Sequence, residues 1–172
     1  NDKNMVSQGQ YFNPLTSLYL FPRGEDFSDV AVYERYDDLS GVNTQYWPYG
    51  DLGGVSSQNP YWIMNRMNRE NDRRRYKLAA SLQYNIIEGL NVQGRVSIDN
   101  TESKYTEKFH AGTVGNFAGP KGRYKEENRL DRQVYADVLA NFNKTFNEFN
   151  VTANLGASIK DLRMELTSLH GD

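Results

Sequence analysis

The chain contains few residues that could perform acid–base catalysis. Its two histidines, His110 and His170, lie in loop-like sequence, and no set of nucleophile, base and orienting carboxylate can be assembled around either. Three pairs of carboxylates are adjacent in sequence, but adjacent side chains point apart on regular elements and make poor acid/base pairs. These pairs are Glu25-Asp26, Asp37-Asp38 and Glu126-Glu127. We therefore predict no catalytic residue and no enzymatic activity.

The sequence offers equally little for a metal or a cofactor. It has no cysteine, which excludes a disulfide framework, a cysteine nucleophile and thiolate metal ligands. The glycine-rich stretch 50–54 fits neither a phosphate-binding nor a dinucleotide-binding motif. We expect no metal site and no cofactor.

Four aromatic side chains in the first half of the chain are the candidates for contact with a substrate or a partner. Exposed aromatic rings stack on the apolar faces of sugars and also anchor protein interfaces. The alternative interpretation is that the rings pack a long loop against its neighbours. The four residues are Trp47, Tyr49, Tyr61 and Trp62.

A run of basic residues at the end of the same half also allows two interpretations. It could bind an acidic ligand or lipopolysaccharide phosphates, or it could be the solvated base of a loop that Glu70 and Asp72 partly balance. The basic residues are Arg66, Arg69, Arg73, Arg74, Arg75 and Lys77.

Composition narrows the class of protein. The 172 residues carry a net charge of −2, which argues against a nucleic-acid binder. The longest uninterrupted apolar run is four residues, whereas a transmembrane helix needs about 20. With 13% aromatic and 24% charged residues the chain does not read as disordered. It opens with neither an initiating methionine nor a signal peptide, so we interpret it as a fragment.

Residues 1–75 are predicted to form a long loop region with short helical turns. Gly, Pro, Asp and Asn punctuate this segment, and no long period governs its aromatic residues. Two helical starts are expected, over Leu15–Leu20 and Tyr61–Met67, because each follows an Asn-Pro pair. Asparagine can cap a helix, and proline suits the first helical position.

Residues 76–160 show the period-2 alternation of β-strands. One phase is apolar and the other polar in the expected strands 76–86 and 90–108, and Gly89 allows a tight turn between them. The pattern repeats over the expected strands 133–144 and 149–160, joined by a short turn at 145–148. A polar loop is predicted over about 109–132, and residues 161–172 are expected to leave the last strand.

Three features favour lipid as the environment of the apolar phase. The readable strands run for about ten residues or more, the length that a tilted membrane strand needs. Short turns alternate with long loops, as in outer-membrane barrels. Asn, Gln, Ser, Thr and Gly dominate the polar phase, which suits a hydrated lumen. We therefore predict an all-β fold of antiparallel hairpins from a large transmembrane β-barrel, with a long irregular extracellular loop. A soluble sheet with an ordinary core stays open as an alternative.

Aromatic residues near the predicted strand ends fit the girdles that flank a membrane. Those expected beside the short turns are Tyr84, Phe142, Phe146 and Phe149, and those expected towards the long loops are Tyr76, Tyr105 and Phe109.

Several stretches resemble the SusC/RagA type of TonB-dependent outer-membrane transporter of Bacteroidetes. The resemblance rests on Asn13–Arg23, Gln58–Arg66, the hairpin Arg75–Val96 and Phe149–Gly156, and it covers essentially the whole chain. It implies a many-stranded barrel in the outer membrane, plugged by an N-terminal domain.

The resemblance also implies partners: a SusD-like surface lipoprotein, the TonB complex that supplies energy, outer-membrane lipid, and an oligosaccharide or peptide substrate. No TonB box, plug or closing strand is recognised, so we expect barrel wall and surface loop that cannot transport alone. Two alternatives remain: a soluble secreted β-rich carbohydrate-binding module, and a passive porin without energy coupling.

Overall fold

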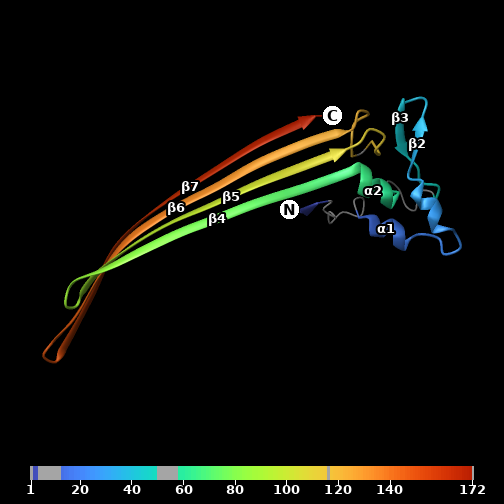
Figure 1. Cartoon of the computed structure of the whole chain (residues 1–172). Coiled ribbons are helices and arrows are strands. Elements are labelled where there is room, and N and C mark those ends of the chain that lie inside the picture. Colours follow the sequence, from blue (N-terminus) through green and yellow to red (C-terminus); the bar gives the residue numbers. More distant parts are fainter. Residues whose placement is uncertain (1, 4–12, 50–57, 116, 172) are drawn as a thin grey trace. The chain divides into compact units, whose positions relative to one another are not determined.

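The computed structural model describes residues 2–3, 13–49, 58–115 and 117–171. Four long strands dominate it (Figure 1). The elements are β1 (Asp2–Lys3), α1 (Pro14–Tyr19), the 3-10 helix η2 (Phe27–Ala31), β2 (Glu34–Asp37), β3 (Val42–Gln45), α2 (Pro60–Arg66), β4 (Met67–Ile87), β5 (Leu90–Phe109), β6 (Arg123–Phe146) and β7 (Phe149–Gly171).

The long strands form one antiparallel sheet in the order β1-β4-β5-β6-β7, and β2 and β3 form a separate hairpin. The predicted all-β fold is therefore confirmed, while no strand within the described ranges closes the sheet into a barrel. The chain divides into two compact units. One comprises Asn1–Asp72, Lys104–Asn128 and Thr167–Asp172, and we call it the loop unit; the other comprises Arg73–Ser103 and Arg129–Leu166, and we call it the sheet unit.

Both tight turns lie where the sequence placed them. Gly89 has a φ of +85°, and a Cβ built there would lie 2.4 Å from the carbonyl oxygen of Asn143. Only glycine combines this positive φ with so close an approach. The second turn contains Asn147, with a φ of +53°, a conformation that asparagine tolerates better than most residues.

The strands extend well beyond their predicted bounds. β4 begins at Met67 rather than at residue 76, and β6 begins at Arg123 rather than at residue 133. The predicted loop 109–132 is therefore too long, because the connection occupies only 110–122. Residues 161–171 continue β7 instead of leaving it. In the extensions of β4 and β6 the alternation fades because charged and polar residues occupy both faces. In β7 the alternation continues with its phase reversed, since Leu162, Met164 and Leu166 lie at even positions.

The loop unit has a small apolar core that α2 and the ends of the long strands build together. Its buried residues are Trp62, Ile63, Met67, Phe109 and Ala118. The indole N–H of Trp62 donates a hydrogen bond of 3.3 Å to the Thr113 hydroxyl. Phe109, which the sequence suggested for an interfacial girdle, is instead part of this core.

Both predicted helices are present within one residue of the expected bounds, and the caps have the expected form. Asn13 accepts from the backbone N–H of Leu15 at 3.0 Å, and Asn59 accepts from that of Tyr61 at 2.9 Å. The hairpin β2–β3 was not predicted, because its sequence shows no apolar alternation.

Asn59 is the polar centre of the loop unit. Its side chain is fully buried, and its amide nitrogen donates to the carbonyl oxygens of Val30 at 2.9 Å and Tyr46 at 3.1 Å. Its backbone N–H donates to the side chain of Gln45 at 2.7 Å. One residue thus joins the start of α2 to η2 and to the chain after β3.

We predict that Asn59→Ala destabilises the loop unit by about 2–4 kcal/mol, because two buried carbonyl groups and the helix cap lose their partner. Amide hydrogen exchange of α2 measures the effect. The matched control is Asn65→Ala on the exposed side of the same helix, where we expect less than about 0.5 kcal/mol. Equal losses in the two variants would contradict the role given to Asn59.

Candidate functional site

Polar contacts between neighbouring strands define one face of the sheet unit. Arg75 of β4 holds Asp99 of β5 with two bonds of 2.9 and 2.6 Å. Arg95 of β5 holds Asp137 of β6 at 2.9 and 3.1 Å. Each contact joins odd-numbered residues of adjacent strands, and the Asn91–Asn141 bond of 2.9 Å does the same. Odd positions of β4, β5 and β6 therefore share one face, as the alternation predicted.

On β7 the even-numbered residues lie on this same face. Arg129 of β6 reaches the sulfur of Met164 at 3.8 Å. A Cβ built on Gly156 would lie 3.0 Å from the Leu139 side chain. Because Gly156 has no side chain, it leaves room for Leu139, a large apolar residue among the odd, mainly polar positions of β6. The polar phases of all four long strands thus form one continuous surface.

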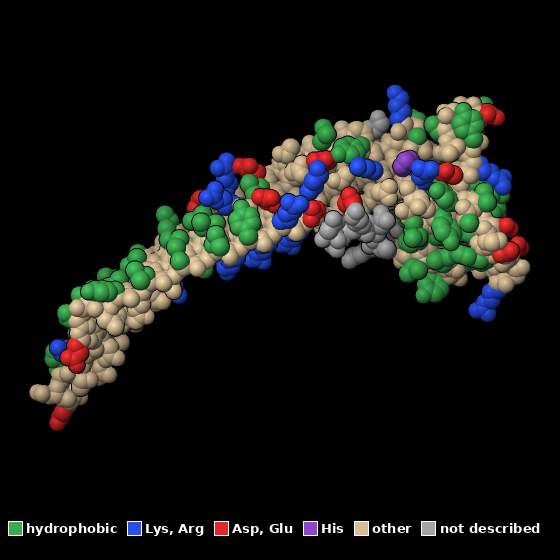
Figure 2. Space-filling model, viewed as in Figure 1, with side chains coloured by type: hydrophobic (Ala, Val, Ile, Leu, Met, Phe, Trp, Pro, Cys, Tyr) green, Lys and Arg blue, Asp and Glu red, His purple; other side chains and the backbone are tan. Residues whose placement is uncertain are grey.

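The opposite face carries the apolar phase, and many of its large side chains are exposed, most of them on β4 and β7. Leu78 is 67% exposed, Leu82 78%, Leu155 79% and Ile159 70%. Figure 2 shows apolar side chains following the long strands. Monomeric soluble proteins rarely leave such a continuous apolar surface open to water.

The apolar face forms a belt with sharp limits, which we call the apolar belt. It comprises Tyr76–Ile86, Leu90–Ile98, Val134–Phe142 and Phe149–Ile159, taken at alternate positions. The next residues on the same face are polar or charged, namely Arg74, Asn100, Arg132 and Asp161. Each segment is about ten residues long, which is the length that a tilted membrane-spanning strand needs.

Aromatic residues mark both ends of the apolar belt. Tyr76 is 54% exposed at one end, and Tyr84, Phe146 and Phe149 are 51–75% exposed near the turns. Tyr105 does not belong to this set, because it lies on an odd position and its hydroxyl donates to Glu107 at 2.8 Å. Apart from Tyr105 and Phe109, the aromatic residues expected for a girdle lie on the apolar face.

Three of the four candidate contact residues lie in one aromatic cluster of the loop unit. The rings of Trp47 and Tyr49 are 5.2 Å apart, and Tyr49 lies 4.7 Å from Phe21. Phe21 contacts Phe27 at 5.4 Å, and Phe27 lies 6.4 Å from Tyr61. No sequence pattern indicated that Phe21 and Phe27 would connect the candidate residues.

The cluster is only half-buried, so it offers ring surface for contact. Phe27 is 41% exposed, and Trp47, Tyr49 and Tyr61 are intermediate. Desolvation, together with the nearby carboxylates of Asp29 and Glu25, raises the pKa of the Tyr49 hydroxyl. Trp62, the fourth candidate, is 1% exposed and belongs to the core, where packing accounts for it.

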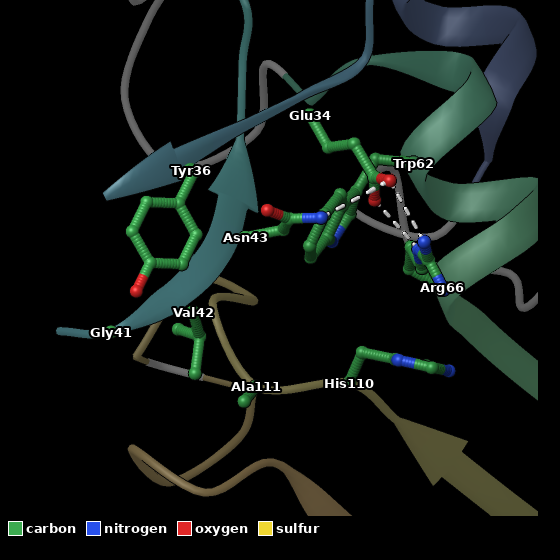
Figure 3. Close-up of a pocket in the computed structure, with 9 residues that line it drawn as sticks. All are labelled: Glu34, Tyr36, Gly41, Val42, Asn43, Trp62, Arg66, His110 and Ala111. Carbon is green, nitrogen blue, oxygen red and sulfur yellow. Dashed lines mark hydrogen bonds and ion pairs between the residues drawn. The ribbon is translucent and has the colours of Figure 1, made fainter. Parts of the chain in front are cut away.

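A polar pocket of about 310 Å³ lies between the hairpin β2–β3, α2 and the start of the loop after β5 (Figure 3). Arg66 Nε and Nη2 each donate to the Glu34 carboxylate at 2.8 Å, and the Asn43 amide approaches the same carboxylate at 3.4 Å. Hydrogen bonding to Arg66 lowers the pKa of Glu34 and raises that of Arg66. The pair joins α2 to the hairpin.

Much of the basic run has intramolecular partners. Arg66 pairs with Glu34, Arg69 with Glu107 at 3.3 Å, and Arg75 with Asp99. These pairs favour a structural role for the run over the binding of an acidic ligand.

No protein-family model matches the chain, and no curated protein matches it significantly. In the part of the chain that the structure describes, no helix is long and apolar enough to cross a membrane. The same residues contain no group of three or more His, Asp or Glu that could hold a metal ion.

The Glu34–Arg66 pair predicts a pH dependence of the loop unit. Because the folded-state pKa of Glu34 lies below its ordinary 4.5, the pair stabilises the fold above that pH. The stabilisation is lost as the pH falls through the folded pKa. We expect amide protection in α2 to weaken below about pH 4.5.

Glu34→Gln should weaken this protection at pH 7 and remove its acid dependence. Asp38→Asn is the control, since Asp38 is exposed and makes no ion pair within the described ranges. An unchanged acid profile in Glu34→Gln would show that the pair does not hold the loop unit.

Proposed function

We propose that this chain is part of an outer-membrane TonB-dependent transporter of the SusC/RagA type, which imports glycans or peptides together with a SusD-like lipoprotein. The observation that carries the proposal is the apolar belt of the sheet unit. On each long strand it covers about ten residues, and it is partly exposed, flanked by aromatic residues and backed by a mainly polar, ion-paired face.

In this proposal β4–β7 are wall strands of a transmembrane β-barrel. The apolar belt faces the hydrocarbon of the outer membrane, and the opposite face lines a hydrated lumen. Arg95 and Asp137 suit that lumen, because an ion pair retains its hydrogen bonds beside water but is costly in lipid. The two-residue turns point to the periplasm, and the described residues of the loop unit that lie outside the long strands are placed at the cell surface.

The largely unpaired edge strands β4 and β7 also fit a position within the wall of a barrel. Along the described residues β7 pairs only with β6, and β1 covers just two residues of β4. Unpaired backbone groups cannot remain in lipid, so further strands of the barrel would pair these edges. The barrel closure, the plug and the TonB contact belong to the proposal and lie outside the chain.

The loop unit would supply the contact surface at the mouth. Trp47, Tyr49 and Tyr61, with Phe21 and Phe27, form the half-exposed ring surface that a sugar or a partner protein can use. A soluble carbohydrate-binding module could use the same rings. The apolar belt disfavours that alternative, because a soluble module would have to cover this face.

Charge substitution on the two faces tests the orientation. We predict that Leu82→Arg or Val96→Arg impairs membrane assembly by about 2–4 kcal/mol, because the guanidinium would face the hydrocarbon near mid-belt. Gln83→Arg and Gln93→Arg, one face away, are the matched controls and should assemble normally. Outer-membrane fractionation and the urea resistance of the full-length protein measure assembly.

If all four variants assemble equally well, the apolar face does not meet lipid. If the full-length protein stays monomeric and folded in plain buffer and does not fractionate with the outer membrane, the transporter proposal fails.

A further inference from the structure

A second pocket of the loop unit, of about 570 Å³, is lined by cations. It lies where β5 ends and β6 begins, next to Gly171 at the end of β7. Its charged or titratable lining consists of Lys108, His110, Lys121 and Arg123, and Tyr124 and Phe109 add aromatic rings. No carboxylate belongs to the lining among the described residues, so the pocket is electropositive.

A tight turn brings these side chains together. Gly122 has a φ of +96°, and its N–H donates to the carbonyl oxygen of Gly119 at 2.9 Å. A Cβ at residue 122 would lie 2.5 Å from the carbonyl oxygen of Phe109. The glycine therefore lets the start of β6 approach the end of β5 closely. Lys121 and Arg123 consequently flank the same opening as Lys108.

The two lysines are available for a ligand. Lys108 and Lys121 are exposed, and the described part of the chain gives neither an ion pair. Arg123 shares Glu107 with Arg69, at 3.4 and 3.3 Å, and its Nη1 donates to the Phe117 carbonyl oxygen at 3.3 Å. Its guanidinium is therefore already paired, and the lysines supply the charge that is open to a ligand.

The carboxylates on the neighbouring strand segments already have other partners. Glu107 is held by two arginines and by the Tyr105 hydroxyl. Glu126 binds Lys104 at 3.0 Å, and Glu127 binds Lys125 at 2.8 Å. Lys108 and Lys121 are therefore the lining cations without an ion-pair partner among the described residues, whereas Arg123 is paired with Glu107. A concave surface of one sign concentrates ions of the opposite sign.

We infer that this pocket binds an acidic ligand with several separated carboxylates. The cations are spread around an opening much larger than a single small anion needs, and lysine and arginine both form charge-assisted hydrogen bonds to carboxylates. A short acidic oligosaccharide and a short acidic peptide carry this same chemistry. The inference does not depend on the proposed transport function.

Isothermal titration of the full-length protein in detergent micelles tests the inference with four probes of similar length. Trigalacturonate and triglutamate are the acidic probes, and maltotriose and trialanine are their neutral counterparts. We expect at least one acidic probe to bind at least about tenfold more tightly than its counterpart, with an affinity that falls as salt increases. If only one acidic probe binds, it assigns the ligand as an acidic oligosaccharide or an acidic peptide. If both bind, the carboxylates are sufficient for recognition.

The double variant Lys108→Gln/Lys121→Gln should weaken acidic-probe binding by about tenfold, since each exposed charge contributes modestly. Both side chains are exposed, so the fold is retained. Arg23→Gln is the control, because it removes one exposed charge from the loop unit outside the pocket. Binding of no acidic probe, equal binding of the neutral probes, or unchanged binding by the double variant would each overturn the inference. Loss of membrane fractionation with retained acidic-probe binding would overturn only the transport proposal.

Discussion

The structure depends on the separation of an apolar face from a polar face by a single layer of strands. Within the apolar belt, alternate residues of β4–β7 form an apolar surface that is partly open, and the residues between form a mainly polar surface joined by Arg75–Asp99 and Arg95–Asp137. A sheet with an ordinary soluble core would bury the first surface. Here neither face is covered within the described residues, so the stability of the wall depends on what surrounds it. This is the reason for proposing a membrane.

Different interactions stabilise the loop unit. Its apolar core is small, and buried hydrogen bonds hold its separate elements together. Asn59 joins α2 to η2, and the Glu34–Arg66 pair joins α2 to the hairpin β2–β3. Glu107 of β5 forms ion pairs with Arg69 of β4 and Arg123 of β6. Such a unit can present surface groups without a large core. It presents two unlike surfaces, an aromatic cluster and a cationic pocket.

Whether a feature could be predicted from the sequence depends on the interaction that produces it. The alternation from Tyr76 to Ile86 reveals strand, phase and turn because burial of one face imposes a period of two. The extensions of β4 and β6 gave no such signal, since their pairing relies on backbone bonds and ion pairs between residues distant in sequence. The extension of β7 does alternate, but in the opposite phase from Leu162 onward. Separation in sequence also explains why the contact between Phe21 and Tyr49 and the shared pocket of Lys108 and Lys121 could not be predicted. Trp62 was proposed for contact by its type, yet its burial against Phe109 could be seen only in the fold.

The central claim concerns which solvent the apolar belt meets. Single cysteines at Leu82 and Gln83, introduced into a cysteine-free form of the full-length protein and labelled with an environment-sensitive fluorophore in lipid vesicles, address it directly. The account predicts blue-shifted emission at position 82 that lipid-embedded quenchers reduce, and emission at position 83 that aqueous iodide reduces. Iodide quenching at both positions, or a buried probe at 82 that neither quencher reaches, would contradict it.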